Sequence, residues 1–525
     1  MSTSLWRSDV LRKIGESVEW DVVVVGGGAT GLGTAVEAAS RGYRTLLFEA
    51  QDFAKSTSSR STKLVHGGVR YLQQGNIKLV LEALRERGRM LHNAPHLAHR
   101  RAFVIPVYAF WEFPFYGVGL KIYDGLAGKE SLGRSRILSR KETLEALPTV
   151  RQQGLQGGVL YYDGQFDDAR YAISLLRTLF NLGGTALNYA KVTSLLKRNG
   201  AVCGVIAGDD ETGARFECPA KLVVNATGIF SDDLRRMDEP ETSKILAVSQ
   251  GTHLVLPRAF LPGDSALMVP RTSDGRVLFA IPWHDRIVVG TTDDPVPNPE
   301  YEPRALPDER RFLLEHVERF LCKRPEPSDI LSLWSGQRPL VSKTNSSNTA
   351  AISRDHTILI SNSKLVTVTG GKWTTYRRMG QDVIDRGAPL AGLPATESKT
   401  AGLRLHASPS SASASSNEWK QVYGGDLPLL NKLMDENAEF ARPLHDRLPF
   451  QRVEVAWAVR YEMARRVEDV LARRTRALFL DARASMEAAP VVARIMAAEL
   501  GNDVAWELRQ AAEFGAIAKQ YQWNE

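Results

Sequence analysis

The sequence predicts an α/β protein that combines an N-terminal βαβ unit with an antiparallel sheet and a C-terminal helical domain. Three observations support this fold class. A glycine-rich turn separates a short β-branched run from a helix near residue 25. Short strand-like runs alternate with turns from about 245 to 295. Charged amphipathic stretches fill the chain from about 418 to 525, which is typical of packed helices.

The composition is that of a globular protein with several domains. The chain has 525 residues, of which 43% are hydrophobic and 24% charged, so wholesale disorder, collagen and a disulfide scaffold are excluded. Its three cysteines form no CxxC pair, which favours a reducing compartment. The net charge of +7 suits an anionic ligand or surface. We expect no nucleic-acid binding, because no such motif is present.

Residues 1–20 are expected to form a separate amphipathic segment. Leu5, Val10, Leu11 and Ile14 lie roughly along one side of a short helix. Charges interrupt every apolar run, which argues against a signal peptide. No run of about 18 uncharged apolar residues occurs anywhere in the chain, so we expect no membrane-spanning helix.

The turn from residue 26 to 31 fits the G-x-G-x-x-G pattern of a dinucleotide site. Gly26 permits the tight turn, Gly28 lets the backbone approach a pyrophosphate, and Gly31 allows close packing of helix and strand. Glu49 follows the second strand, 18 residues later, where a carboxylate accepts a hydrogen bond from a ribose 2′-hydroxyl. The unit is therefore Rossmann-like, and FAD or NAD fits better than NADP.

Two later junctions between a strand and a glycine turn favour FAD. One strand ends in Ala226, Thr227 and Gly228, and another ends in Gly370 and Gly371. Junctions so far apart in the chain suit a long ligand with two ends. This architecture resembles the FAD-linked oxidoreductases related to D-amino-acid and glycine oxidases. The resemblance implies that the first junction lies near the dinucleotide and the second near the flavin.

This resemblance predicts the division of the chain into domains. An FAD-binding domain is expected over about 21–100, 165–240 and 345–400, interleaved with a substrate domain over about 101–164 and 241–344. Residues 401–417 are Ser-rich and are expected to form a linker. Residues 418–525 are expected to form the helical domain.

Four local patterns, in order and spacing, narrow the resemblance. They are TSS at 57–59 followed by KLVHGGVRYL at 63–72, GTHLV at 251–255, SGQRPL at 335–340, and GGKWTTYR at 370–377. Over about 20–515 the chain resembles the FAD-dependent, quinone-linked glycerol-3-phosphate dehydrogenases. Trp373 departs from the family, which commonly has a smaller apolar residue there. The resemblance assigns further residues to the cofactor: Thr57, Ser58, Ser59, Lys63, His66, Gly67, Lys372 and Thr374.

The same resemblance implies the substrate sn-glycerol 3-phosphate, and the residue types fit it. Arginine binds phosphate oxygens in a bidentate manner, and Arg70 and Arg338 are the candidates, with Tyr71 beside Arg70. The product would be dihydroxyacetone phosphate, with the C2 hydride passing to flavin N5. His253 is the candidate base for the hydroxyl proton, because a neutral imidazole titrates in a suitable range. Lys372 is the alternative base, and a purely structural role remains open for each of these side chains.

The acceptor implied by the resemblance is a membrane quinone, so we expect a phospholipid surface as partner. Attachment is expected to be peripheral, on the cytoplasmic face of a bacterial inner membrane. Two segments are candidates for this contact: residues 108–126, with many aromatic side chains, and the N-terminal segment with Trp6. The alternative for residues 108–126 is a lid or subdomain core. The tail is expected to form a solvated face or a dimer contact with its basic residues, including Arg465, Arg466, Arg473, Arg474 and Arg476.

The sequence leaves three other functions open and disfavours a metal site. His92, His96 and His99 are interrupted by Pro95, so their rings need not share a helix face. The functional alternatives are a glycerol-3-phosphate oxidase that uses oxygen, an amine or amino-acid oxidase of the same fold, and an FAD-binding protein without turnover. A homodimer is expected, without a specific motif for it.

Overall fold

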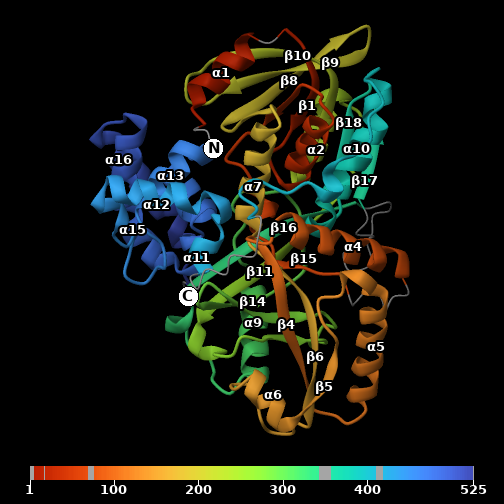
Figure 1. Ribbon diagram of the computed structural model, residues 1–525, viewed down its shortest axis with the longest axis vertical. Coiled ribbons are helices and arrows are strands. Elements are labelled where there is room, and N and C mark those ends of the chain that lie inside the picture. Colours follow the sequence, from red (N-terminus) through yellow and green to blue (C-terminus); the bar gives the residue numbers. More distant parts are fainter. Residues whose placement is uncertain (1–4, 17, 69–75, 342–355, 410–417, 524–525) are drawn as a thin grey trace.

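The computed structural model describes residues 5–16, 18–68, 76–341, 356–409 and 418–523. Figure 1 shows three regions: one sheet with its helices at the top, a second sheet at the bottom, and a cluster of helices beside them. The predicted α/β class, the antiparallel sheet and the C-terminal helical domain are all confirmed.

The first sheet has a parallel centre, which begins with the predicted strand at residue 20. In this sheet β1 pairs in parallel with β2 and β10, β10 with β18, and β2 with β7. Strand β1 is buried along almost its whole length, which suits a central parallel strand. The strands of this sheet are β1 (Trp20–Val25), β2 (Thr45–Phe48), β7 (Thr185–Leu187), β8 (Ala190–Arg198), β9 (Ala201–Asp209), β10 (Arg215–Asn225), β17 (His356–Ile360) and β18 (Val366–Gly370).

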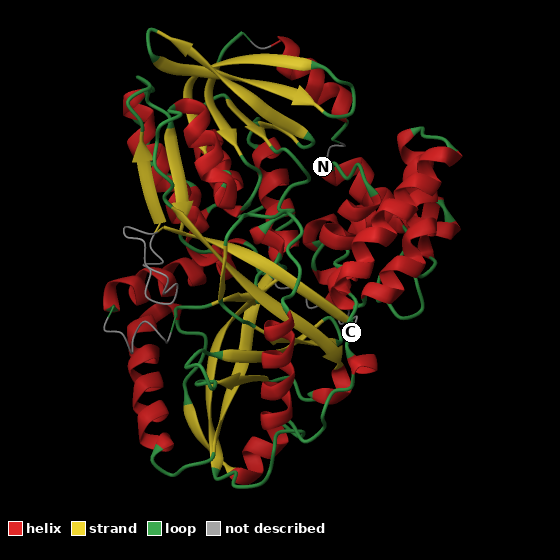
Figure 2. Ribbon diagram, turned by 180° about the vertical axis from the view of Figure 1, so that it is seen from behind, coloured by secondary structure: helices red, strands yellow, loops and turns green. Residues whose placement is uncertain are grey.

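The second sheet is mostly antiparallel and is centred on a long strand, β11, seen from behind in Figure 2. Because β11 pairs with β14 on one side and β16 on the other, His253 lies opposite both Gly290 and Trp334. The strands of this sheet are β3 (Leu64–Val65), β4 (Ala98–Val107), β5 (Arg136–Ser139), β6 (Gly157–Phe166), β11 (Leu246–Pro257), β12 (Ala266–Val269), β13 (Leu278–Trp283), β14 (Arg286–Gly290), β15 (Asp294–Val296) and β16 (Ser332–Val341).

We propose the domain division expected from the sequence, with one change. Strands β4 to β6 and β11 to β16 lie in the second sheet, and the remaining strands after β3 lie in the first. Strand β3 pairs with β6, so Leu64 and Val65 belong to the second sheet although they fall within the segment 21–100. This short strand carries the chain from the dinucleotide turn towards the substrate side.

The helices lie close to where the amphipathic patterns place them. The sequence predicts helices over about 77–92, 168–182 and 307–321, and α4, α7 and α9 are observed there. The helices of the two-sheet part are α1 (Arg7–Glu16), α2 (Ala29–Ser40), α4 (Ile77–Asn93), α5 (Glu112–Ala127), α6 (Arg140–Ala146), α7 (Asp168–Asn181), α8 (Ser231–Asp238), α9 (Pro307–Phe320) and α10 (Tyr376–Leu390). Within the described ranges, no helix is long and apolar enough to cross a membrane.

The C-terminal region is a cluster of helices packed against both sheets (Figure 1). They are α11 (Glu418–Gln421), α12 (Leu427–Glu436), α13 (Val453–Glu462), α14 (Ala477–Leu480), α15 (Ala482–Leu500) and α16 (Val504–Ala518). Residues 401–409 of the expected linker are packed rather than free: Leu405 is buried and His406 is hydrogen-bonded to Asn181 and Asp426. Residues 410–417 lie outside the described ranges.

The expectation of a solvated face or dimer contact is wrong for three tail arginines. Arg473, Arg474 and Arg476 are fully buried. Arg473 and Arg474 both bind the Asp52 carboxylate, at 2.6 and 2.7 Å, whereas Arg476 pairs with Asp167. The basic pattern of the tail therefore marks buried ion pairs between the helical region and the first sheet.

The N-terminal helix α1 forms as expected, but it does not present its apolar side to solvent. Val10 and Ile14 are buried in the same core as the first sheet. Arg7 is also buried, and it binds the side chains of Asn188 and Asp209. The apolar side of α1 is therefore covered by the core and is not available for contact with a membrane.

Candidate active site

The glycine turn after β1 is too tightly packed for larger residues. A Cβ atom on Gly26 would lie 2.5 Å from the carbonyl oxygen of Ala226, and one on Gly31 would lie 1.8 Å from that of Gly26. Gly26 also has φ +109°, a conformation that side-chain-bearing residues avoid. The backbone alone therefore forms the surface here, beside the N-terminus of α2, where N–H groups and the helix dipole attract phosphate.

The other predicted dinucleotide residues gather at the same end of the first sheet. Glu49 follows β2, and its carboxylate accepts hydrogen bonds from the N–H groups of Gly27 and Gln51 at 2.6 and 2.8 Å. The junction that contains Thr227 and Gly228 begins where Ala226 donates to the carbonyl of Val25. Dinucleotides bind at this carboxyl edge of parallel strands.

The segment Thr57–Ser59 connects the glycine turn with the second sheet. The N–H of Ala29 donates to Ser58 Oγ at 2.9 Å, next to Gly28. The hydroxyl of Thr57 donates to the carbonyl of Gln337 on β16 at 2.6 Å. These contacts carry the site from the phosphate-binding end towards a cavity between the two sheets.

Lys63 differs from its expected role beside the cofactor. Its ammonium group is fully buried and lies 2.8 Å from the Asp168 carboxylate. The rings of Trp283, Trp334 and Phe479 surround it at about 5 Å. Lys63 does not line the cavity described below. Its charge is therefore committed to an internal ion pair, which fixes the backbone between Ser59 and β3.

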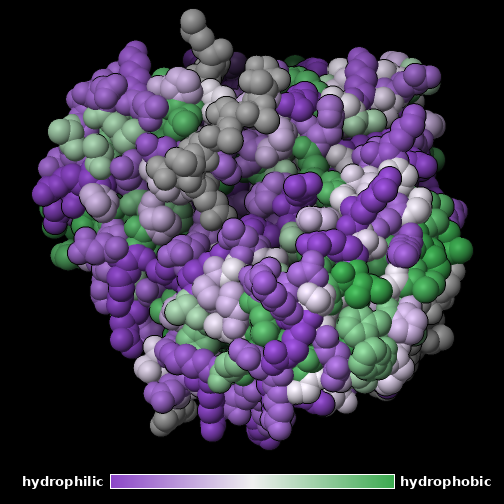
Figure 3. All heavy atoms as spheres, turned by 60° about the horizontal axis from the view of Figure 1, so that its bottom comes forward, coloured by the Kyte–Doolittle hydropathy of each residue, from purple (hydrophilic) through white to green (hydrophobic). Residues whose placement is uncertain are grey.

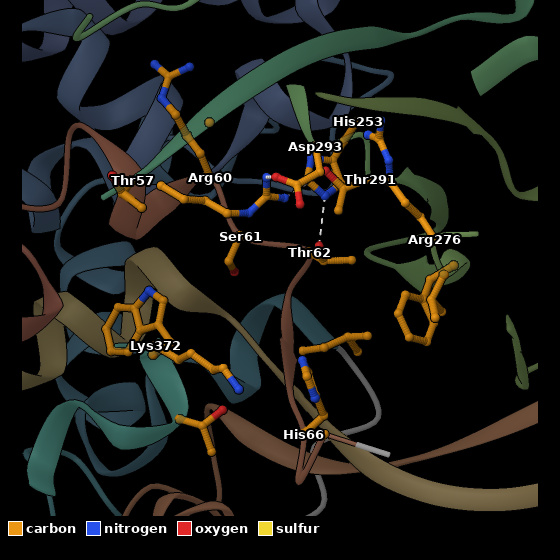
Figure 4. Close-up of a pocket in the computed structure, with 18 of the residues that line it drawn as sticks. Thr57, Arg60, Ser61, Thr62, His66, His253, Arg276, Thr291, Asp293 and Lys372 are labelled. Atoms are coloured by element: carbon orange, nitrogen blue, oxygen red, sulfur yellow. Dashed lines mark hydrogen bonds and ion pairs between the residues drawn. The ribbon is translucent and has the colours of Figure 1, made fainter. Parts of the chain in front are cut away.

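A cavity of about 310 Å³ lies between the two sheets and brings together most of the predicted flavin and substrate residues. Figure 4 shows His253 and Thr291 on one side and Lys372 and His66 on the other. The predicted residues that line the cavity are Thr57, His66, His253, Arg338, Gly370, Gly371, Lys372 and Thr374. Gly67 lies just behind this wall, where its N–H donates to the Tyr123 hydroxyl at 2.8 Å.

His253 is a buried side chain of β11 that reaches the cavity. Its Nε2 atom lies 2.9 Å from the hydroxyl of Thr62 (Figure 4), and its ring stacks on Trp334 with 4.1 Å between ring centroids. Burial, together with the positive charges of Arg338 and Lys63, holds the pKa of His253 well below its usual range. The imidazole is therefore neutral at pH 7.

Arg338 reaches the cavity from β16. Its guanidinium lies 3.2 Å from both the Thr291 hydroxyl and the Asp293 carboxylate. A Cβ atom on Gly251 would lie 2.3 Å from the same guanidinium, which explains the glycine of the GTHLV pattern. The arginine is thus held in one orientation and still lines the cavity.

Lys372 follows a turn in which Gly370 and Gly371 have φ +77° and +70°. The turn directs the lysine to the cavity wall (Figure 4). The next residue is the unusual Trp373, whose indole N–H donates to the carbonyl of Ser58 at 2.8 Å. The larger side chain therefore ties the GGK turn to the Thr57–Ser59 segment.

Several residues that line the cavity were not predicted from the sequence, and among them are the polar side chains of Thr62 and Arg276. Thr62 supplies the hydroxyl beside His253, and Arg276 adds a guanidinium from the turn before β13. Thr62 directly precedes the KLVHGGVRYL pattern at 63–72, and this position could have indicated that it lies at the site. Arg276 stands in an ordinary-looking turn and carried no signal. Arg70 and Tyr71 lie outside the described residues.

These features fit FAD. The glycine turn with Glu49 suits the adenosine diphosphate end, because Cβ atoms at Gly26 and Gly31 would collide with the backbone of Ala226 and Gly26, and glycine lets the turn pack tightly with its N–H groups uncovered. The cavity beside the Gly370–Gly371 turn suits the flavin end. The Thr57–Ser59 segment links the two ends through Ser58 and Thr57.

The fold and this site define an FAD-dependent oxidoreductase, and comparison with known proteins agrees. A family described as "FAD dependent oxidoreductase" matches residues 21–377, and "C-terminal domain of alpha-glycerophosphate oxidase" matches residues 365–506. A glycine oxidase from Geobacillus kaustophilus has a similar fold, with a TM-score of 0.50 at 17% identity over 74% of this chain and 99% of its own.

Relatives that match nearly all of this chain narrow the class to one family. The chain is 39% identical to the human mitochondrial glycerol-3-phosphate dehydrogenase over 92% of this chain and 71% of the human protein. It is 39% identical to the Arabidopsis thaliana mitochondrial enzyme SDP6 over 94% and 85%. The solved glycerol-3-phosphate dehydrogenase of Bacillus halodurans, complexed with FAD, is 29% identical with a TM-score of 0.80 over 98% of both chains.

The chain therefore belongs to the FAD-dependent glycerol-3-phosphate dehydrogenase family, and its cofactor is FAD. The family resemblance and the cofactor predicted from the sequence are both confirmed.

Proposed function

We propose that this protein oxidises sn-glycerol 3-phosphate at C2 to dihydroxyacetone phosphate and passes the electrons to a quinone in a phospholipid membrane. The observation that carries the proposal is the cationic cavity beside the flavin turn, in a chain of this family. Arg276, Arg338 and Lys372 all line it. A phosphate dianion needs several cations, whereas a carboxylate substrate is satisfied by one arginine.

The side chains of the cavity suggest a division of labour. Bound FAD supplies the hydride acceptor for C2. The arginines orient the phosphate, and Arg338 is held by Asp293 and Thr291 in a fixed geometry that lowers the cost of binding. The hydroxyl proton leaves to His253 or to Lys372, the two basic groups predicted from the sequence. The low pKa of His253 weakens it as a base.

The decisive experiment is anaerobic. The purified flavoprotein in mild detergent receives sn-glycerol 3-phosphate without NAD, and its visible flavin band is recorded. Rapid bleaching, reversed by a quinone analogue and only slowly by oxygen, is expected. Rapid recovery in oxygen with peroxide release would instead identify an oxidase. If sn-glycerol 3-phosphate does not bleach the flavin, or if an amino acid bleaches it instead, the substrate assignment is wrong.

The role of Arg338 can be tested in the same assay. Arg338→Ala removes the guanidinium that faces the cavity from β16. We expect kcat/KM for sn-glycerol 3-phosphate to fall at least about tenfold, equivalent to roughly 1.4 kcal/mol. The flavin spectrum serves as the control for folding. An unchanged kcat/KM would remove Arg338 from the site.

Helix α5 supports the membrane part of the proposal. One side of this helix and the turn before it expose large apolar side chains that water solvates poorly. They are Phe110, Trp111, Phe115, Val118 and Ile122. We call these five residues the α5 patch. Figure 3, which turns this end of the molecule towards the viewer, shows hydrophobic side chains gathered at one edge.

The chain that follows the α5 patch exposes several basic residues. They are Lys129, Arg134, Arg140 and Lys141, with the acidic Glu130 and Glu142 among them. An apolar surface accompanied by cations suits an anionic leaflet. We therefore propose peripheral attachment through this patch, on the cytoplasmic face of a bacterial inner membrane. A homodimer is part of the same proposal and is measured by light scattering on the purified protein.

A further inference from the structure

The hydroxyl of Thr62 is the feature of the cavity to which the mechanism above gives no role. It lies 2.9 Å from His253 Nε2, and it also lines the cavity. No second hydrogen bond of this hydroxyl occurs among the residues that the structure describes. Thr62 thus stands between the imidazole and the space for the substrate (Figure 4).

We propose that Thr62 and His253 form a pair of hydrogen-bond donors aimed at the reacting oxygen: His253 Nε2–H donates to the Thr62 hydroxyl, which donates to the C2 oxygen of the substrate. This inference rests on the proposed function. It makes Thr62 the group that touches the substrate and His253 a positioning residue behind it. It also removes His253 as the base.

The surroundings of the other ring nitrogen of His253, Nδ1, favour donation from Nε2–H to the Thr62 hydroxyl. His253 Nδ1 is buried, and within the described ranges it has no hydrogen-bond partner. If Thr62 donated to Nε2, the ring proton would sit on Nδ1 as a buried N–H without an acceptor, which proteins rarely tolerate. With the proton on Nε2, only a lone pair is left unmatched at Nδ1, and the Thr62 proton is free to turn towards the cavity.

The surrounding charges keep the imidazole neutral. Arg338 faces it from β16, with Asp293 bound to that arginine, and Lys63 lies behind Trp334 with Asp168 bound to it. An imidazolium would meet two cations and would leave Nδ1–H unsatisfied. His253 therefore acts as a donor throughout the physiological pH range, and the hydroxyl proton must leave to another group, of which Lys372 is the basic side chain in the cavity.

The C2 oxygen is the better target than the phosphate. The phosphate carries charge throughout and is matched by Arg276 and Arg338. The C2 oxygen is neutral in the bound alcohol and becomes negative as its proton leaves. An uncharged donor pair with fixed geometry stabilises such charge as it develops. Its loss should consequently lower kcat more than it raises KM.

Conservative substitutions at Thr62 and His253 distinguish a pair of hydrogen-bond donors from a catalytic base. Thr62→Val keeps the shape without the hydroxyl, and Thr62→Ser restores the hydroxyl. His253→Gln keeps an N–H donor but has no basic nitrogen. We expect Thr62→Val to lower kcat about tenfold, Thr62→Ser to stay within about threefold of wild type, and His253→Gln to lose no more than about tenfold.

Three results would overturn the proposal. A loss in His253→Gln of about a hundredfold or more would restore His253 as the base. An effect of Thr62→Val on KM alone would place Thr62 at the phosphate. Equal losses in Thr62→Val and Thr62→Ser would show that the hydroxyl is irrelevant.

A readout independent of turnover is the tautomer of His253. In the 15N-histidine-labelled holoenzyme, with the signal assigned by its loss in His253→Gln, the proton is expected on Nε2, and Thr62→Val should shift that nitrogen. A proton on Nδ1 would contradict the donor pair. The wild-type bleaching experiment judges the proposed function separately, because it does not depend on Thr62.

Discussion

Helices α1 and α5 were both candidates for membrane contact. The structure buries the apolar side chains of α1 and exposes part of those of α5. In α1, Val10 and Ile14 are buried against the first sheet, and Ile14 keeps only 3% of its surface exposed. In α5, Phe115, Val118 and Ile122 remain at least half exposed, while the opposite face packs through Leu120 and Tyr123.

The difference teaches that an amphipathic pattern identifies the apolar side of a helix but not what covers it. Short α1 has one apolar side, and that side is used by the core. Helix α5 is apolar on two sides, so the core covers one and leaves the other exposed. A helix with more apolar surface than its own domain can cover is the stronger candidate for a membrane.

The largest expected effect is on stability. Ile14→Ala in α1 removes buried methylene groups and should lower the free energy of unfolding by about 2 to 4 kcal/mol. Ile122→Ala in α5 is the matched control, since Ile122 is 50% exposed; its effect should stay within about 0.5 kcal/mol. Denaturant unfolding followed by tryptophan fluorescence measures both. Equal effects would abolish the contrast between the two helices.

The next effect is on vesicle binding. Trp111→Ala combined with Phe115→Ala removes two exposed rings of the α5 patch. The partition constant of the protein on vesicles containing anionic lipid should fall at least about thirtyfold, equivalent to roughly 2 kcal/mol. Anaerobic bleaching by sn-glycerol 3-phosphate should be unchanged, whereas reduction of quinone held in the vesicles should fall. Undiminished binding in co-sedimentation would refute the α5 patch as the membrane contact.

A smaller effect is expected from the basic residues. Arg140→Gln removes one exposed charge from the chain that follows the patch. It should weaken binding to anionic vesicles about fivefold, equivalent to roughly 1 kcal/mol. Binding to vesicles made only of zwitterionic lipid should not change. The same loss on both kinds of vesicle would mean that charge is not the cause.

The smallest effect is expected in the N-terminal segment. Trp6 is 45% exposed beside α1, whose apolar face is covered. Trp6→Ala should leave vesicle binding within about twofold of wild type, since a single scattered apolar residue is an ordinary surface feature. A loss as large as that of the Trp111 and Phe115 pair would return the membrane contact to the N-terminus.

The sequence predicted the parts of the site that depend on local backbone chemistry. Each of the two glycine turns, at 26–31 and at 370–371, follows a strand. A glycine turn in that position is typical of a cofactor-binding site. His253, Arg338 and Lys372 were predicted through the family patterns around them, and all three line one cavity.

The side-chain contacts that the sequence did not reveal are contacts between residues far apart in the chain. Lys63 was expected at the cofactor, but Asp168, 105 residues away, neutralises it inside the core. Arg473 and Arg474 were expected at the surface, but both are buried and bind the Asp52 carboxylate. Arg276 enters the cavity only because β13 and β14 fold next to β11. Periodicity carries no information about such pairings.

The contact of Asp52 with Arg473 and Arg474 has a consequence for how the enzyme comes apart. Asp52 lies in the loop between Glu49 and Thr57, two residues predicted to bind the cofactor, so the helical tail is bonded to this loop. Loss of either partner would leave a buried charge unpaired, at a cost of about 3 to 5 kcal/mol. We therefore expect the helical tail and the loop from Glu49 to Thr57 to unfold together. Because the arginines hold the pKa of Asp52 below its ordinary value, this stabilisation persists above the unfolded pKa and is lost only in strong acid. A protease that cuts ahead of the tail would consequently release flavin along with the helices.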